Sequence, residues 1–198
     1  MKYTDNIKAV ATLQPDYLGF IFYKKSKRNF EGAIPELSKN IKKVGVFVDA
    51  SIDFVNEKIR RYHLDVIQLH GEESPKFCKK FHNTNVKVVK VFSVGITFDF
   101  NVLKDYESVV DYFLFDTKGT QKGGNGITFN WTLLEDYPSK KPYFLSGGIG
   151  SESVTDLQKF KQSKAAKYCY AIDVNSRFED YAGFKNTDKL KKFKNTIL

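Results

Sequence analysis

The sequence predicts an α/β fold in which the strands of a parallel sheet alternate with helices. Short, unbroken apolar runs recur along the 198 residues at a steady interval. These runs are rich in β-branched and aromatic residues, which is typical of strands buried on both faces of a parallel sheet. Segments with apolar residues at helical spacing lie between several of the runs. Such alternation predicts parallel strands joined by right-handed crossovers.

The chain is expected to open with a helix rather than a strand. Thr4-Asp5 resembles an N-cap, and Ile7, Val10 and Ala11 would lie on the apolar face of that helix. The predicted strands are Tyr17–Phe22, Val44–Val48, Val66–Leu69, Val86–Val91, Tyr112–Phe115, Tyr143–Leu145 and Tyr170–Val174.

Further helices are predicted between and after the strands. Ser51 is a candidate N-cap for Ile52–Tyr62, and Ser74 precedes Pro75, a residue that suits the first position of a helix. The remaining predicted helices are Ser151–Phe160, with Ser151 and Ser153 as candidate caps, and Thr187–Phe193.

Seven strands behind an opening helix indicate an eightfold (βα)8 TIM barrel whose first strand is missing from this chain. An open doubly wound sheet is the alternative, but it usually concentrates its functional groups at one switch point. Here a polar residue or a glycine follows nearly every predicted strand, as the rim of a barrel active site requires. We expect residues 1–198 to form a single barrel domain.

Composition narrows the class of protein. Hydrophobic residues make up 41% of the chain, and no apolar stretch is long enough to span a membrane. Met1 to Leu13 lacks the continuous apolar centre of a secretory signal. The two cysteines, Cys78 and Cys169, have no metal-ligand neighbours in sequence, so we expect free thiols in a reducing cytoplasm and no metal site.

The net charge of +9 raises the question of nucleic-acid binding. The lysines are scattered, and the densest cluster, Lys185 to Lys194, alternates with apolar residues in the pattern of a solvated helix face. We therefore expect no nucleic-acid partner. The excess positive charge would instead raise the local concentration of an anionic substrate.

One aspartate stands out as a candidate catalytic group. Asp116 ends an apolar aromatic run, and a glycine-rich loop containing Gly123-Gly124-Asn125-Gly126 follows it. The pattern favours an acid at the carboxyl end of a buried strand under a loop that closes over it. The alternatives are an N-cap or an acidic residue of a surface loop.

Two loops after the last strands are candidate phosphate sites. Gly147-Gly148 leaves a strand and enters a predicted helix, where exposed backbone amides bind phosphate. Asn175-Ser176 follows the next strand, and barrels often bind phosphate after their final two strands. Alone, the double glycine is equally consistent with a tight turn.

Two further residues have both a functional and a structural interpretation. The guanidinium of Arg28 is suited to holding a carboxylate in two-point fashion, or it belongs to a basic loop. His70, which precedes Gly71, is either a site residue or a turn histidine.

The ordered set of motifs resembles the phosphoribosylanthranilate isomerase family of tryptophan biosynthesis. The motifs are Tyr17-Leu-Gly-Phe-Ile-Phe-Tyr with Ser26-Lys-Arg28, Gly45-Val-Phe-Val, Val66-Ile-Gln-Leu-His-Gly-Glu, Gly123-Gly-Asn-Gly-Ile-Thr-Phe-Asn-Trp131, Leu145-Ser-Gly-Gly-Ile149 and Ile172-Asp-Val-Asn-Ser176. They run the length of the chain in the family's order.

The resemblance implies a ribulose-phosphate-binding barrel that performs an Amadori rearrangement without cofactor or metal. Its substrate would be the small molecule N-(5-phosphoribosyl)anthranilate and its product 1-(2-carboxyphenylamino)-1-deoxyribulose 5-phosphate. An aspartate acts as general acid on the ribose ring oxygen, and a cysteine acts as general base on the C2 proton. A cytoplasmic monomer or homodimer is expected.

Residue by residue, the resemblance makes Asp116 the general acid and places Arg28 near the anthranilate carboxylate. His70 and Asp173 match substrate-binding positions. The phosphate-binding positions are Gly147, Gly148, Asn175 and Ser176.

The base has no counterpart, because the family's first strand ends in Lys-x-Cys-Gly and this chain begins just after that motif. We therefore expect the 198 residues alone to have little or no turnover. Either Met1 is an internal methionine of a longer isomerase, or the chain is a non-catalytic barrel that binds a phosphate sugar. Another ribulose-phosphate barrel enzyme is the third possibility.

Overall fold

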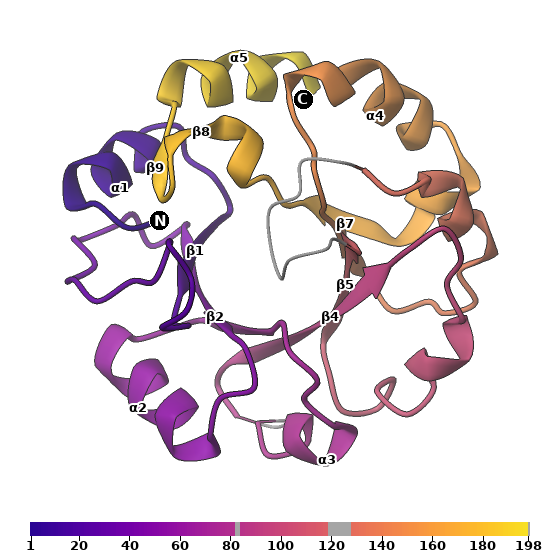
Figure 1. The fold of residues 1–198 in the computed structure, drawn as a ribbon, viewed down its shortest axis with the longest axis horizontal. Helices are drawn as coiled ribbons and strands as arrows, with labels where there is room; N and C mark the ends of the chain where they lie inside the picture. The colour runs from indigo at the N-terminus through magenta and orange to yellow at the C-terminus, as the bar shows by residue number, and fades with distance from the viewer. Residues whose placement is uncertain (82–83, 119–127, 198) are drawn as a thin grey trace.

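The computed structural model describes residues 1–81, 84–118 and 128–197. Within them, one sheet of seven strands curls around a central axis, and the helices lie outside it (Figure 1). Every neighbouring pair of its strands is parallel. The strands are β1 (Tyr17–Ile21), β2 (Lys42–Phe47), β3 (Val66–Leu69), β4 (Lys87–Val94), β5 (Tyr112–Thr117), β6 (Tyr143–Leu145) and β7 (Cys169–Ile172).

The order of the strands distinguishes the two architectures that the sequence allowed. It runs β1-β2-β3-β4-β5-β6-β7, so each strand pairs with the next one along the chain. A doubly wound sheet reverses its order at a switch point, and this sheet does not. The winding is that of a (βα) barrel, and β1 and β7 are the two edges of the sheet in the described part of the chain.

The helix Ile52–Tyr62 has the predicted bounds, and the last helix extends four residues beyond the predicted Phe193. The α-helices are α1 (Thr4–Ala11), α2 (Ile52–Tyr62), α3 (Pro75–Cys78), α4 (Val154–Lys161) and α5 (Thr187–Ile197). The 3-10 helices are η1 (Phe100–Leu103), η2 (Trp131–Asp136), η3 (Ser151–Ser153), η4 (Lys164–Tyr168) and η5 (Ser176–Phe178). Residues 22–41, which connect β1 to β2, contain no helix, so a strict alternation of strand and helix is wrong at this connection.

Ser51 and Ser74 cap their helices with side-chain hydrogen bonds. Thr4-Asp5 does not stand at the N-cap position of α1, whereas Ser153 stands at the N-cap position of α4 without a capping bond. Ser51 Oγ accepts from the Phe54 N–H at 3.2 Å, and Ser74 Oγ accepts from the Phe77 N–H at 3.3 Å. Thr4-Asp5 lies inside the first turn of α1 rather than before it. The Ser153 hydroxyl accepts from the Gly150 N–H at 3.1 Å, so it closes the preceding turn and does not cap α4.

A small hairpin was not predicted. It consists of β8 (Glu179–Tyr181) and β9 (Phe184–Lys185), which pair antiparallel between β7 and α5. Its strands are too short to give an alternating pattern. Figure 1 shows the hairpin beside α1.

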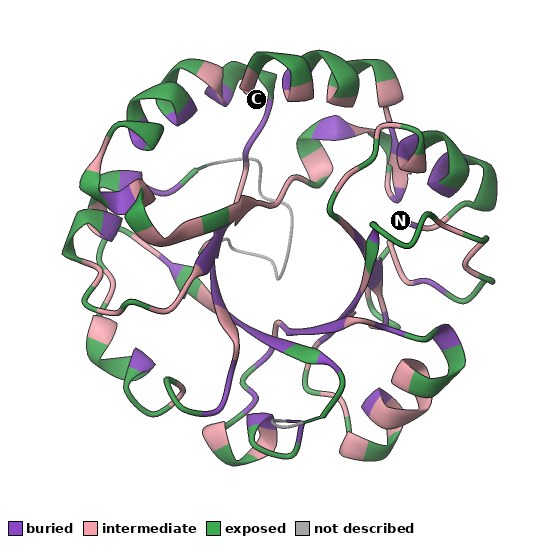
Figure 2. Cartoon of the chain, turned by 180° about the vertical axis from the view of Figure 1, so that it is seen from behind, coloured by how far each residue is buried: buried purple, intermediate pink, exposed green. Residues whose placement is uncertain are grey.

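Two apolar clusters hold the sheet in place. The larger one lies between the sheet and the surrounding helices and includes Phe47, Ile67 and Phe113, all fully buried. The smaller one fills the space inside the curled sheet and consists of Val44, Val66, Val89, Val91, Leu114 and Phe144. Figure 2 shows that buried residues line the strands and the inner sides of the helices. Within the described ranges, no helix is long and apolar enough to cross a membrane.

Candidate active site

The site residues follow from the alternation of side chains along the strands. Successive residues of a strand point to opposite faces, so positions two apart share a face. Asp116 lies two residues after Leu114, and Ser146 lies two residues after Phe144, both members of the inner cluster. Asp173 likewise lies two residues after Ala171, which packs against that cluster. These polar groups therefore face the barrel axis at the carboxyl ends of β5, β6 and β7.

Asp116 and His70 form the centre of the site. Oδ2 of Asp116 lies 3.2 Å from Nε2 of His70, and Oδ1 accepts from the Thr117 N–H at 2.9 Å. Both side chains are only partly exposed, 16% for Asp116 and 23% for His70. Asp116 belongs to the end of β5 and is neither an N-cap nor part of a surface loop. This pair is a candidate acid with a partner that orients it.

The turn that carries His70 is built tightly. The His70 N–H donates to the Phe47 carbonyl at 2.8 Å, which continues the β2–β3 pairing by one residue. A Cβ at Gly71 would lie 2.2 Å from Oδ1 of Asp49, so only glycine fits there. The carboxylate of Glu73 accepts from the N–H groups of Gly71 and Asp49.

A buried ion pair also stabilises the turn that carries His70. Lys90 Nζ lies 3.1 Å from Oε2 of Glu73 and also donates to the carbonyl of Gly71 at 2.6 Å. The two side chains are 3% and 2% exposed. Buried charges of this kind persist only when they are paired and fully hydrogen-bonded. Sequence reasoning missed this pair, because a lysine inside a strand is indistinguishable from one that faces solvent.

The charges of Asp116 and His70 both act on the carboxyl group of Asp173. Its N–H donates to the Leu145 carbonyl at 2.8 Å, and its Oδ2 accepts from the Ser146 hydroxyl at 3.5 Å. Burial raises the pKa of the Asp173 carboxyl, and the charge of Asp116 raises it further. Lys185 and His70 act in the opposite direction and do not cancel the rise. The site therefore contains two neighbouring carboxyl groups, and the charge of Asp116 reaches the buried carboxyl of Asp173.

The first predicted phosphate loop has the backbone that only glycine adopts readily. Gly147 and Gly148 have φ values of +93° and +66°. A Cβ at Gly147 would lie 2.2 Å from Oγ1 of Thr117, at the end of β5. The double glycine is thus a tight turn packed against the strand that carries Asp116, and η3 begins three residues after Gly148.

The second predicted phosphate loop lies beside the first. Asn175 ends the turn after β7, and Ser176 opens η5. Arg177 Nε lies 3.3 Å from Oε1 of Glu152 in η3, which joins the two loops. The structure thus brings together the loops after β6 and β7 that the sequence suggested.

Arg28 meets a carboxylate of the protein itself. Its Nε donates to Oε1 and Oε2 of Glu179 at 3.1 and 2.9 Å, and its Nη2 donates to Oε2 at 2.7 Å. The residue is therefore more than a member of a basic loop. Glu179 was not anticipated, because its role depends on the short β8–β9 hairpin.

Lys185 corrects the prediction of a solvated lysine cluster from Lys185 to Lys194. Its ammonium group is buried and lies 3.0 Å from Oε1 of Glu179. It also donates to the backbone carbonyl of Asn175 at 2.9 Å and to the side-chain oxygen of the same residue. Burial lowers the pKa of Lys185 even though Glu179 and Asp173 favour the charged form. Lys185 departs from the prediction because it belongs to β9, whereas Lys189, Lys191 and Lys192 on α5 are exposed as expected.

Neither cysteine belongs to the site. Cys78 ends α3, and Cys169 begins β7 at the end of the sheet opposite to Asp116. Burial raises the pKa of Cys78 to about 11 and that of Cys169 to about 12. Both thiols are therefore protonated at neutral pH and unsuited to act as bases.

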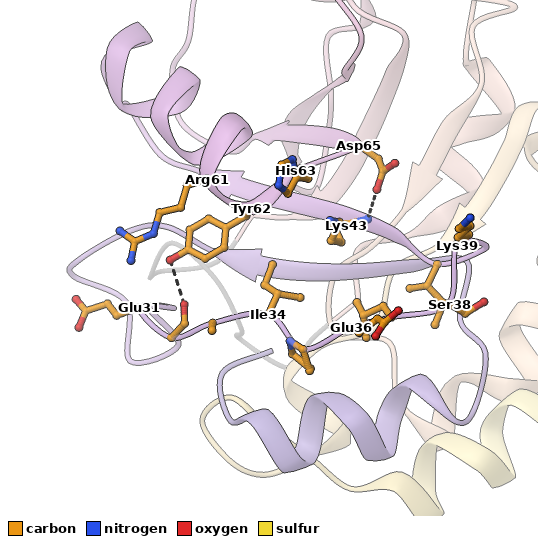
Figure 3. Close-up of a pocket in the computed structure, with 15 residues that line it drawn as sticks. Glu31, Ile34, Glu36, Ser38, Lys39, Lys43, Arg61, Tyr62, His63 and Asp65 are labelled. Carbon is orange, nitrogen blue, oxygen red and sulfur yellow. Dashed lines mark hydrogen bonds between the residues drawn. The ribbon is translucent and has the colours of Figure 1, made fainter.

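The glycine-rich loop with Gly123-Gly124-Asn125-Gly126 lies outside the described residues. A cavity of about 880 Å³ lies between residues 31–41 and the end of α2 (Figure 3). Lys43 and Asp65 line it near the amino ends of β2 and β3. The cavity therefore lies at the amino ends of the strands, whereas Asp116 lies at their carboxyl ends. Within the described ranges, no group of three or more His, Cys, Asp or Glu side chains is arranged to hold a metal ion.

Comparisons with known proteins show the family of the chain. The profile of the N-(5'-phosphoribosyl)anthranilate (PRA) isomerase family matches residues 1–196. The N-(5'-phosphoribosyl)anthranilate isomerase of Parabacteroides distasonis is 41% identical over 204 aligned positions, which cover 100% of this chain and 90% of that protein.

Solved structures extend the agreement to the fold. The phosphoribosyl anthranilate isomerase of Thermus thermophilus superposes with a TM-score of 0.83 at 23% identity, covering 100% of this chain and 94% of the other. Another isomerase structure, in complex with reduced 1-(o-carboxyphenylamino)-1-deoxyribulose 5-phosphate, has a TM-score of 0.75 at 26% identity, with 100% and 94% covered. The chain belongs to the phosphoribosylanthranilate isomerase family.

Proposed function

We propose that this chain provides the substrate pocket and the acid of an isomerase that converts N-(5-phosphoribosyl)anthranilate into 1-(2-carboxyphenylamino)-1-deoxyribulose 5-phosphate. The observation that carries the proposal is the Asp116–His70 pair at the carboxyl end of the barrel, 3.2 Å apart and facing the axis. Groups at this end carry the chemistry of barrel enzymes.

In the proposed reaction, Asp116 is the general acid. It donates its proton to the ribose ring oxygen, the bond between that oxygen and C1 breaks, and the anilino nitrogen forms a Schiff base with C1. A base then removes the C2 proton, and the electron pair moves to give an enolamine. Tautomerisation of the enolamine yields the ketose. All atoms are retained, so no oxidant, reductant or cofactor is consumed.

The two anionic ends of the substrate would bind on either side of Asp116. The phosphate would accept hydrogen bonds from the loops at Gly147-Gly148 and Asn175-Ser176, which Arg177 and Glu152 hold together. The anthranilate carboxylate would meet Arg28, while His70 and Asp173 would contact the sugar.

Among the described residues, neither cysteine is placed to act as the base. The thiols of Cys78 and Cys169 lie away from Asp116 and have raised pKa values. We propose that a cysteine on a further strand, docked between the edges β1 and β7, completes both the sheet and the acid–base pair. On this proposal, residues 1–198 are one barrel domain that lacks its first strand.

The test compares two proteins: the 198-residue chain, and the same chain preceded by a strand that ends in Lys-x-Cys-Gly. Isomerase activity is followed as the loss of fluorescence of freshly prepared phosphoribosylanthranilate. We expect turnover from the longer protein and little or none from the shorter one. Absence of turnover from both, with folding confirmed by circular dichroism, would contradict the proposed activity.

The absence of a suitable cysteine near Asp116 favours one second candidate, a phosphate-sugar-binding barrel without catalysis. It predicts that the longer protein binds reduced 1-(2-carboxyphenylamino)-1-deoxyribulose 5-phosphate in calorimetry but does not turn over substrate. Turnover by the longer protein excludes it.

A further inference from the structure

The β8–β9 hairpin is fixed firmly to the first helix. The side-chain amide of Asn6 in α1 donates to the Lys185 carbonyl at 2.8 Å, and the Lys185 N–H donates back to Asn6 Oδ1 at 2.7 Å. Both residues are buried. Figure 1 shows the hairpin and α1 side by side next to β1. The hairpin is therefore a rigid support and not a loosely held loop.

Glu179 of this hairpin is surrounded by donors. It accepts from Arg28, from Lys185 at 3.0 Å and from the Gly183 N–H at 3.2 Å, and its side chain is only 4% exposed. Burial alone would raise the pKa of Glu179, but the bonds from Arg28 and Lys185 outweigh this effect and lower it. The carboxylate is thus held in its charged form.

The contact between Glu179 and Arg28 uses one particular edge of the guanidinium. Nε and Nη2 face Glu179, which fixes the plane of the group. The adjacent edge, formed by Nη1 and the outer hydrogen of Nη2, makes no hydrogen bond to the described residues. A guanidinium presents its donors in a rigid fork, so this second edge matches one further carboxylate. The Arg28 side chain is 21% exposed, so the ion pair with Glu179 does not bury it completely.

Lys185 connects this carboxylate-binding end to the other end of the site. Its ammonium group bonds both Glu179 and Asn175, and Asn175 precedes the helix that opens at Ser176. Arg28, Glu179, Lys185 and Asn175 form one continuous chain of polar contacts. The hairpin therefore holds groups from the two proposed anion-binding ends of the pocket in a fixed relation.

We propose that Glu179 is a positioning residue for substrate selection: it holds Arg28 so that the free edge of the guanidinium meets the aromatic carboxylate. Lys185 compensates the charge of Glu179 and ties it to the Asn175 turn. The inference rests on the proposed function, because it assumes that Arg28 faces that carboxylate. If the Arg28–Glu179 ion pair served stability alone, its loss would weaken the binding of every ligand equally or leave all binding unchanged.

The test measures binding and needs no turnover. Calorimetry compares two ligands, reduced 1-(2-carboxyphenylamino)-1-deoxyribulose 5-phosphate and its anilino analogue without the carboxylate. In Glu179→Gln we expect the Kd for the first ligand to rise by about ten- to a hundredfold, the effect of one disrupted charge-assisted bidentate contact. The Kd for the second should stay within about threefold, which also shows that the variant folds.

A double-mutant cycle separates positioning from stability. In an Arg28→Ala background, Glu179→Gln should cause no further loss of affinity for the carboxylate ligand, because both act through the same contact. The matched control is Asp111→Asn. Oδ1 of Asp111, at the amino end of β5, lies 2.8 Å from Lys87 Nζ, and loss of this ion pair should change neither Kd.

Each outcome discriminates. Three results would overturn the positioning role and leave the proposed function intact. Glu179→Gln could raise the Kd of both ligands equally, it could raise neither Kd, or the losses of affinity in the double variant could be additive. Failure of the unaltered protein to bind the carboxylate ligand would overturn the proposed function, and the inference would fall with it.

Discussion

The imidazole Nε2 of His70 lies 3.2 Å from Oδ2 of Asp116, although the two residues come from different strands of the sheet. His70 reaches this position because the β2–β3 pairing continues through its N–H to the Phe47 carbonyl. Asp116 reaches it because β5 extends past Phe115 to Thr117. The contact is therefore set by strand lengths and register.

Replacing the proposed acid should abolish catalysis but spare binding. In the protein that carries the added strand, Asp116→Asn should lower kcat by about 10²–10⁴, the usual contribution of a general acid. The Kd for the reduced product analogue should change by no more than about threefold, because the amide keeps the shape of the carboxyl. Steady-state kinetics and calorimetry measure the two quantities. A kcat within about threefold of the unaltered protein would assign the acid to another residue.

Replacing Asp173 should stabilise the fold while impairing the site. Its pKa is raised in the folded state by burial and by Asp116, so the folded state disfavours its ionised form. This group's contribution to stability is fully present below the unfolded pKa of about 3.9 and is lost as pH rises through the folded pKa. Asp173→Asn should therefore raise Tm more at pH 7.5 than at pH 4, by about 2–4 °C for each 1 kcal/mol gained.

Differential scanning calorimetry at the two pH values tests the Asp173 prediction. Asp156 lies on α4 with its side chain 71% exposed, so Asp156→Asn should leave Tm nearly unchanged at both pH values. A Tm of Asp173→Asn below that of the unaltered protein at pH 7.5 would show that the ionised carboxylate is stabilised in the fold.

Breaking the buried pair under the His70 turn should be costly. Glu73→Gln leaves the Lys90 ammonium without its counter-charge, for which we expect a loss of about 3–5 kcal/mol in the free energy of unfolding. Combining it with Lys90→Met should recover part of the loss, since no uncompensated charge then remains. Urea unfolding measures the stability of Glu73→Gln, of Lys90→Met and of the double variant. Strictly additive losses would argue against a coupled pair. The control is Glu57→Gln, whose side chain is 43% exposed and which should change stability by less than about 0.5 kcal/mol.

The tight turn after β6 should not tolerate a side chain. Gly147→Ala would place Cβ 2.2 Å from Thr117 Oγ1 at a φ of +93°, so we expect destabilisation by at least about 1–2 kcal/mol and weaker binding of the reduced product analogue. Gly32→Ala is the control, because its Cβ would meet only Phe30 at 3.6 Å, an ordinary contact. Equal stability of the two variants in urea would contradict the argument.

The seven strands of the sheet were predictable because unbroken apolar runs are a strong signal. Val66–Leu69 and Tyr143–Leu145 have the predicted bounds, and Asp116 stands at the end of its strand as expected. The repeat left a barrel and a doubly wound sheet open, and the observed strand order is that of the favoured barrel. Whether Arg28, His70, Asp173 and the two phosphate loops bind substrate stays a prediction.

What the sequence did not reveal depends on contacts between distant residues. Lys185 resembles its exposed neighbours in sequence, and only the pairing of β8 with β9 brings it to Glu179. Lys90 is likewise buried because Glu73 comes to it from a different turn. Propensity and periodicity describe neighbours along the chain, so partners many residues apart stay invisible to them.

The sequential order of the strands also shapes how the molecule opens and closes. Each strand from β2 to β6 pairs with a strand on both sides, whereas β1 and β7 each pair with one strand in the described sheet. The outer edge of β1 accepts hydrogen bonds from Met1 and Phe30, which belong to no strand. Amide hydrogens should therefore exchange with solvent last in β3 to β5 and first at the two ends. The free energy of local opening should then decrease from the middle strands toward β1 and β7. The strand that carries Asp116, β5, belongs to the most stable part of the sheet.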